Sequence, residues 1–297
     1  MLQLLLELIP CLAVGLALGW FNPALPARLA PPLVRFGVPL SVAGLLLRSG
    51  VGVELADAAG LSLVLILVGL LALQWPALRR WWPLGVMRLG AATGNTAYFG
   101  VPVVLALLPP ASLALAVTYD IVGTLVTWTV GPPLVSGQRP SGLSVARHLL
   151  GSPAVHGMVL ALLLQLTPWA TGLAQLLWWP ARMVILVALT LLGMRLGVML
   201  RSGEVHRQAL SALRPALLMK LLVLPALMTL LATLTGQPVA VRDVLVLQAA
   251  TPTAISVLLI AEASLKDVSA AAGLVFASTG IALVSVPLWW LALQALG

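Results

Sequence analysis

The stretch that decides the fold is GNTAYFGVPVV, residues 94–104, with Asn95, Thr96 and Pro102 among its residues. It lies inside an apolar run, residues 84–108, that is long enough to cross a bilayer. Glycines flank the polar pair, and each of these residues weakens a helix. Pro102 also lacks the N–H that a helix would donate to the carbonyl four residues earlier. The stretch therefore predicts a membrane helix that is broken near its centre.

A second interrupted run, LQAATPTAISVLLIAE, covers residues 247–262, where Gln248, Thr251 and Thr253 surround Pro252. Non-helical backbone at mid-membrane is tolerated only where protein or a water-filled cavity surrounds it. Because proline is favoured at the first position of a helix, we expect a second half-helix to start at each of the two prolines. Two ordinary proline kinks are the alternative interpretation.

The composition is that of an integral membrane protein. Of the 297 residues, 61% are hydrophobic and 8% are charged, and the mean hydropathy is +1.10. A soluble domain carries about 25% charged residues. The apolar runs are continuous and lack the alternation of a membrane barrel. We therefore expect an all-α polytopic membrane protein.

Apolar runs of spanning length predict ten transmembrane helices, with the fourth and ninth broken. Their ranges are 2–20, 33–48, 58–75, 84–109, 111–135, 148–168, 173–197, 211–234, 241–262 and 267–295. The longest polar connection, residues 136–147, divides them into five and five. An odd number of helices in each half forces the halves into opposite orientations if they are repeats. We therefore predict two inverted five-helix repeats, residues 1–140 and 141–297.

Two pairs of matching positions support the inverted repeat. Arg48 in LLLRSGV and Arg195 in GMRLGV differ by 147 positions, and Pro102 and Pro252 differ by 150. Both pairs fall in corresponding helices at nearly the same offset, as an inverted repeat requires.

The basic residues predict the orientation of the chain, because cytoplasmic loops carry an excess of Lys and Arg. One side would hold Arg28, Arg35, Arg79, Arg80, Arg88, Arg139, Arg147, Arg195, Arg201, Arg207, Arg214 and Lys266. The other would hold Arg48, Arg182 and Arg242. The first side is therefore expected to be cytoplasmic, with both termini outside the cell's inner (plasma) membrane. The N-terminal MLQLLLELIP has no basic segment, so its run is expected to be a retained helix rather than a signal peptide.

The two broken helices predict an anion-binding site where they cross at mid-membrane. Their second halves would run apart in opposite directions, so that two helix N-termini, each with a partial positive charge, converge at the centre. Such ends suit a small anion, typically a carboxylate. The candidate substrate-binding residues are Asn95, Thr96, Gly100, Pro102, Gln248, Thr251, Pro252 and Thr253.

Two charged residues fall deep within predicted helices, Asp120 in the fifth and Lys220 in the eighth. A charge at that depth costs at least about 2.5 kcal/mol, so each should face the bundle interior or a partner. They are candidates for a proton-coupling or gating pair. The alternatives are a structural ion pair, or an Asp120 that caps backbone freed by the break.

The motifs quoted above resemble those of the auxin efflux carrier family, which includes plant PIN-type exporters and bacterial carriers. The resemblance lies in Asn-Thr-x-x-x-Gly-x-Pro at Asn95, in the segment around Pro252, in TYDIV around Asp120 and in Asp-x-Ser-Ala-Ala at Asp267. With the ten-helix pattern, it covers the length of the chain. It implies a scaffold of helices 1, 2, 6 and 7, and a transport domain of helices 3–5 and 8–10 that moves as an elevator.

We accordingly expect a secondary transporter for a small organic anion, such as a dicarboxylate or an auxin-like acid. The expected partners are that anion, the lipid bilayer, a coupling proton or sodium ion, and a second copy of the chain in a homodimer. A sodium-coupled carrier like the bile-acid symporters is the nearer alternative, and an intramembrane enzyme is the more distant one.

Several other classes of function find no support in the sequence. Cys11 is the single cysteine, which excludes an intramolecular disulfide and a cysteine-based metal site. No HExxH, GxSxG or phosphate-loop motif occurs. The net charge of +8 comes from arginines scattered between apolar runs, so nucleic acid is not an expected partner. No cofactor, no metal and no enzymatic activity are expected.

Overall fold

The chain forms a bundle of helices in a computed structural model that describes residues 2–49, 53–137, 146–147, 150–151, 153–202 and 207–296. The described residues contain no β-strand. Six of the helical segments are long and apolar enough to cross a membrane, namely Leu25–Arg48, Leu55–Gln74, Leu113–Ser136, Ala170–Ser202, Ser211–Leu234 and Val268–Ala295. The prediction of an all-helical protein with membrane-spanning segments is confirmed. Arg139, which contributed to the predicted orientation, lies outside the described residues.

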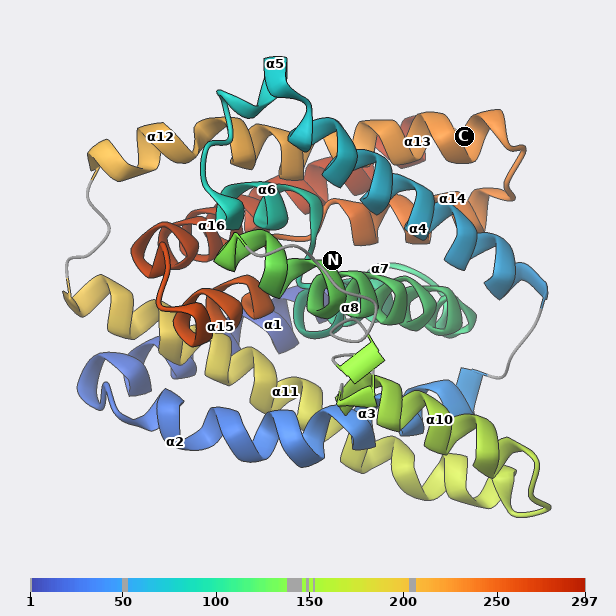
Figure 1. Cartoon of the computed structure of the whole chain (residues 1–297). Helices are drawn as coiled ribbons and strands as arrows, with labels where there is room; N and C mark the ends of the chain where they lie inside the picture. The colour runs from blue at the N-terminus through green and yellow to red at the C-terminus, as the bar shows by residue number, and fades with distance from the viewer. Residues whose placement is uncertain are drawn as a thin grey trace.

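Figure 1 shows the helices in chain order. The first part of the chain contains α1 (Leu2–Phe21), α2 (Leu25–Pro32), η1 (Leu33–Gly37), α3 (Val38–Ser49), α4 (Val53–Gln74), α5 (Pro76–Arg79), α6 (Gly85–Ala92), η2 (Thr96–Gly100), α7 (Val101–Leu107), η3 (Pro110–Ser112) and α8 (Leu113–Ser136). The rest contains α10 (Pro153–Gln165), α11 (Ala170–Ser202), α12 (Arg207–Leu218), η4 (Met219–Val223), α13 (Leu224–Leu234), α14 (Val239–Ala249), α15 (Ile255–Ser264) and α16 (Val268–Ala295).

Both interrupted runs are discontinuous helices. Helix α6 ends at Ala92 and helical backbone resumes at Thr96, while α14 ends at Ala249 and α15 begins at Ile255. The predicted start at Pro252 is therefore wrong, whereas α7 begins at Val101 with Pro102 in its first turn, and the π-turn η2 precedes it. After the first break, helical backbone resumes before Pro102 because the π-turn η2 leads into α7. After the second break, α15 starts after Pro252 because the intervening backbone pairs with the first break.

Three π-helical turns, η1, η2 and η4, share one sequence context. Each ends two residues before a proline, namely Pro39, Pro102 and Pro225. The residue before each proline donates its N–H to the carbonyl five positions earlier, as Val101 does to Thr96. This wider turn relieves the contact between the proline ring and the carbonyl four positions earlier. At Pro225 that carbonyl belongs to Leu221, and it accepts a 2.9 Å hydrogen bond from Trp289 Nε1.

The helices pack in two groups that meet along one boundary. Helices α1, α2, α3, α10 and α11 pack mainly on one another, and they occupy the lower part of Figure 1. Helices α4, α6–α8 and α12–α16 form the other group, in which α7 also contacts α1. Helix α6 and helix α14 from Val241 onward are buried on all sides, which places these two halves of the broken helices at the centre of their group.

Helices α1 and α11 approach each other through glycines. A Cβ on Gly15 would lie 2.9 Å from the Cα of Gly193, and a Cβ on Gly197 would lie 2.9 Å from the backbone nitrogen of Trp20. Gly15 and Gly19 on α1 thus face Gly193 and Gly197 on α11, with four-residue spacing on both helices. Small residues at this spacing let two membrane helices pack backbone to backbone.

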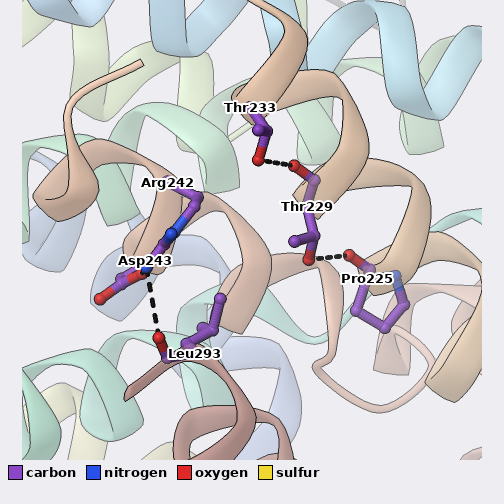
Figure 2. A network of polar contacts seen from close by, with 6 residues as sticks. All are labelled: Pro225, Thr229, Thr233, Arg242, Asp243 and Leu293. Carbon is purple, nitrogen blue, oxygen red and sulfur yellow. Dashed lines mark hydrogen bonds and ion pairs between the residues drawn. The ribbon is translucent and has the colours of Figure 1, made fainter. Parts of the chain in front are cut away.

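A buried ion pair within α14 includes an arginine that also forms a hydrogen bond to the end of α16, as Figure 2 shows. Arg242 Nη2 lies 2.9 Å from Asp243 Oδ1 and donates to the Leu293 carbonyl at 3.3 Å. On α13, Thr229 and Thr233 each donate to the carbonyl four residues earlier (Figure 2).

Candidate functional site

The two helix breaks lie against each other and exchange backbone hydrogen bonds. Asn95 N–H donates to the Pro252 carbonyl at 2.7 Å, and Ala254 N–H donates to the Thr93 carbonyl at 3.3 Å. Gly94 and Thr253 face each other as an antiparallel pair. Backbone groups that would be costly to leave unpaired inside a membrane are satisfied in this way.

Hydroxyl groups satisfy further backbone groups around this crossing. Thr253 donates through Oγ1 to the Gly90 carbonyl at 3.0 Å, and its N–H donates to Ser278 Oγ at 3.0 Å. Thr251 Oγ1 donates to the Gln248 carbonyl at 2.7 Å. Thr251, Thr253 and Gln248 are fully buried, so their role in this structure is to hold the crossing together.

Two glycines allow the breaks to come this close. A Cβ on Gly100 would lie 2.9 Å from the side-chain amide carbon of Gln248 and 2.8 Å from Thr251 Cγ2. A Cβ on Gly94 would lie 3.0 Å from Lys220 Nζ. Real Cβ atoms almost never make such contacts, so a larger residue at either glycine would push the breaks apart.

Asp120, on α8, caps the start of the half-helix formed by η2 and α7. Its Oδ1 accepts a 2.6 Å hydrogen bond from the Thr96 hydroxyl, and the carboxylate also accepts the backbone N–H of Ala97. The side chain is buried, with the residue 6% exposed. A carboxylate at a helix N-terminus is stabilised by the unpaired N–H groups and by the helix dipole.

Lys220 has the opposite role at the end of α14. It is 1% exposed, and its Nζ donates to the carbonyl of Ala249, the last residue of α14, at 2.6 Å. An ammonium group is favoured at a helix C-terminus. Among the described residues, the ion pairs found include none between Lys220 and Asp120. Each of the two charges is bound to a different half-helix end.

A cavity of about 120 Å³ lies beside the crossing, with room for several water molecules or a small organic molecule. The breaks contribute residues 94–98 and 254–256 to its lining, and α8 contributes Asp120, Thr124 and Trp128. The opposite wall comes from α2, η1 and α3 together with α11, which contributes Arg195. The cavity thus lies at the boundary between the two packing groups.

Two residues that line this cavity each carry a buried hydrogen-bond donor without a partner in the described part of the chain. These donors are Asn95 Nδ2, in a residue that is 4% exposed, and Arg195 Nε. Arg195 also forms a long ion pair of 3.8 Å with Glu262 on α15. A buried donor without a partner costs free energy, so such groups mark a place for a ligand.

The two half-helix N-termini differ in how they are satisfied. Asp120 already caps the start of η2, whereas no side chain in the described residues caps α15 at Ala254. Ile255 and Ser256, in the first turn of α15, both line the cavity. The first-turn N–H groups of a helix have no partner within the helix. The free N-terminus, the Asn95 amide and the Arg195 guanidinium together suit an anion.

The candidate residues identified from sequence are therefore divided between the cavity and its support. Asn95, Thr96 and Asp120 line the cavity. The crossing is formed by Gly100, Gln248, Thr251, Pro252 and Thr253. Pro102 lies in the first turn of α7, and Lys220 caps the C-terminal end of α14. Among the described residues, no group of three or more His, Cys, Asp or Glu side chains could hold a metal ion.

Sequence reasoning missed several residues of the cavity lining. On the opposite wall, Arg195 was assigned only to topology and to the repeat. On the broken-helix side, Thr124, Trp128 and Ser256 were not singled out as site residues. The offset between Arg48 and Arg195 was the available signal, yet the two arginines differ in the structure. Arg48 stacks on Trp178 at 4.2 Å, whereas Arg195 faces the cavity.

Comparison with known proteins identifies the family. The model of the family described as membrane transport protein matches residues 138–290, just over half of the chain. The match includes the second break and most of α16. No curated protein matches the chain at a significant level. The chain therefore belongs to the membrane transport protein family, the family of the auxin efflux carriers that its two interrupted helices resemble.

Proposed function

We propose that this protein is a secondary transporter that carries a small organic anion across the membrane. The observation that supports this proposal best is the cavity beside the crossing, because its lining includes two residues with unpartnered donors and the first turn of a helix without a side-chain cap. Asp120, the one carboxylate among the described residues of its lining, is already bound by Thr96 and Ala97. The family is one of transporters, which agrees with a carrier rather than an enzyme.

The transport step in this proposal is alternating access by an elevator movement. Helices α1, α2–α3, α10 and α11 would be the scaffold, and the group that contains both broken helices would move against it. The support is that the two groups pack mainly within themselves and that the cavity lies at their boundary. A ligand bound at the crossing would then move with the broken helices.

The inverted repeat belongs to the same proposal, with residues 1–140 and 141–297 as its halves. The contacts of the two breaks support it. Asp120 on α8 bonds Thr96 at the first break, and Ser278 on α16 bonds Thr253 at the second. In each half, the helix that follows the broken helix thus contacts the break through a polar side chain, charged in one half and neutral in the other.

Uptake into proteoliposomes tests the proposal. Purified protein is reconstituted and assayed with labelled succinate, butyrate and indole-3-acetate, and with labelled choline as a cation control. We expect at least one acid to be taken up faster than into liposomes without protein, and choline not to be. If all acids enter at the protein-free rate, and none shifts the thermal unfolding of the protein, anion transport is wrong.

The coupling ion is tested in the same liposomes by imposing a sodium or a proton gradient in turn. We propose that Asp120 carries a coupling proton, because it is the carboxylate in the cavity lining. Asp120→Asn should then flatten the pH dependence of net uptake while exchange of internal for external substrate persists. The same pH dependence in a well-folded Asp120→Asn protein would leave Asp120 with its capping role alone, and dependence on sodium would favour the sodium-coupled alternative.

A further inference from the structure

Arg195 is a cation that faces the cavity with an incompletely satisfied guanidinium group. Its Nη1 lies 3.8 Å from Glu262 Oε1, near the limit for an ion pair, and its Nε has no hydrogen-bond partner among the described residues. The Arg195 side chain is 13% exposed, and that of Glu262 is 47% exposed. The pair is therefore a weak contact between a mostly buried cation and a half-exposed carboxylate.

We propose that a carboxylate of the transported anion binds Arg195 in place of Glu262, and that the site consequently selects a short dicarboxylate. The proposal rests on the proposed function of anion transport. It adds a specificity-determining residue, a competing residue of the chain itself, and the number of charges on the substrate.

Two walls of the cavity each offer a place for one carboxylate. On the broken-helix side, the uncapped start of α15 and the free Nδ2 of Asn95 can bind the first. On the α11 side, Arg195 can bind the second with two parallel N–H groups, a geometry that arginine favours. A monocarboxylate of the same length can satisfy only one of these walls.

The exchange also bears on the boundary between the packing groups. Arg195 belongs to α11 and Glu262 to α15, so their ion pair joins the two groups. A dicarboxylate that binds Arg195 would break this ion pair. The bound dicarboxylate would then itself contact both walls of the cavity. Occupancy of the site therefore changes what holds α15 to α11.

Calorimetric titration of the purified protein with succinate and butyrate tests this inference, because the two acids share a four-carbon chain and differ by one carboxylate. We expect the wild type to bind succinate more tightly than butyrate. Arg195→Gln should weaken succinate binding by roughly 10- to 150-fold, as for loss of a hydrogen bond to a charged group, and should change butyrate binding far less. Glu262→Gln should tighten succinate binding by about two- to fivefold, because it removes the competing carboxylate.

The double variant, Arg195→Gln with Glu262→Gln, makes the test specific. If Glu262 acts by competing for Arg195, its substitution should have no effect once Arg195 is gone. Arg201→Gln is the matched control, since Arg201 lies on the same helix but donates to the Trp20 carbonyl and does not line the cavity. It should bind both acids as the wild type does.

The outcomes separate this inference from the proposed function. If Asn95→Ala weakens binding of either acid while Arg195→Gln and Glu262→Gln change nothing, the anion site stands and the role of Arg195 is wrong. Equal loss of succinate and butyrate in Arg195→Gln would likewise overturn the selection for two charges. If the wild type binds no carboxylate, the proposed function fails and this inference fails with it.

Discussion

The two charged side chains at this site, Asp120 and Lys220, each bind an end of a broken helix and do not pair with each other. Asp120 binds the start of η2 through Thr96 and Ala97, and Lys220 binds the end of α14 through the Ala249 carbonyl. Each charge offsets the partial charge of a helix end that the break creates inside the bundle. Two ionic groups at this depth thus stabilise the discontinuity that makes room for the cavity.

Substitution of Asn95 tests whether its unpartnered side-chain amide binds the substrate. Its backbone N–H is bonded to Pro252, so a side-chain substitution leaves the crossing in place. Removing a donor to a charged group costs about 1.5–3 kcal/mol, so Asn95→Ala should weaken binding of the transported acid roughly 10- to 150-fold. Asn95→Asp should bind more weakly still, because it adds a negative charge beside the anion. Both proteins should purify as monodisperse species. Wild-type affinity in Asn95→Asp would show that the anion binds elsewhere.

At the scale of elements, the π-turns link the prolines to the site. Leu33 and Val34 of η1 and Thr96 of η2 line the cavity, and η4 contains Lys220. Each turn is the wider turn that a following proline favours. The prolines therefore shape the backbone near the site without themselves lining the cavity.

Pro102→Ala tests this link. Alanine would supply an N–H that can bond the Tyr98 carbonyl, which favours an ordinary α-helical turn over η2. Tightening η2 would rotate Thr96 and Ala97 relative to Asp120 and disturb the cavity. We expect slower transport with little loss of thermal stability, because alanine is the better helix former. Pro180→Ala is the control, since Pro180 is an exposed proline inside α11 and no π-turn precedes it. Unimpaired transport in Pro102→Ala would show that the π-turn η2 is not needed for transport.

Sequence patterns predicted the existence of both breaks but not their exact position. Glycine, polar residues and proline near the middle of an apolar run are enough to indicate a broken helix. Where the helix resumes depends on contacts between segments far apart in the chain, such as the pairing of Asn95 with Pro252. The same limit explains Arg195, because its position in the sequence resembles that of Arg48 and only the packing of α11 turns it toward the cavity.

At the scale of the whole molecule, the glycine contact between α1 and α11 determines how firmly one packing group holds together. Gly197→Leu would force the two backbones apart, and we expect it to destabilise the fold by at least the roughly 1–3 kcal/mol of an overpacked core. Thermal unfolding in detergent measures the change. Gly172→Leu is the matched control on α11, because a side chain there meets open space. Equal unfolding temperatures for the two variants would show that the glycine contact is dispensable.

The orientation of the protein in the membrane determines which end of the bundle faces the cytoplasm. In Figure 1, the α1–α2 and α15–α16 connections lie at one end of the bundle, and the α10–α11 and α13–α14 connections lie at the other. Most of the basic residues are assigned from the sequence to the first end, and Arg48, Arg182 and Arg242 are assigned to the other. We therefore expect this first end to be cytoplasmic and both termini to lie outside. A reporter that is active only in the cytoplasm should be inactive when fused after Gly297 and active when inserted into residues 138–145. The reverse result would invert the orientation, so that the Arg195–Glu262 pair would belong to the outward side of the boundary and substrate would have to reach it from outside the cell.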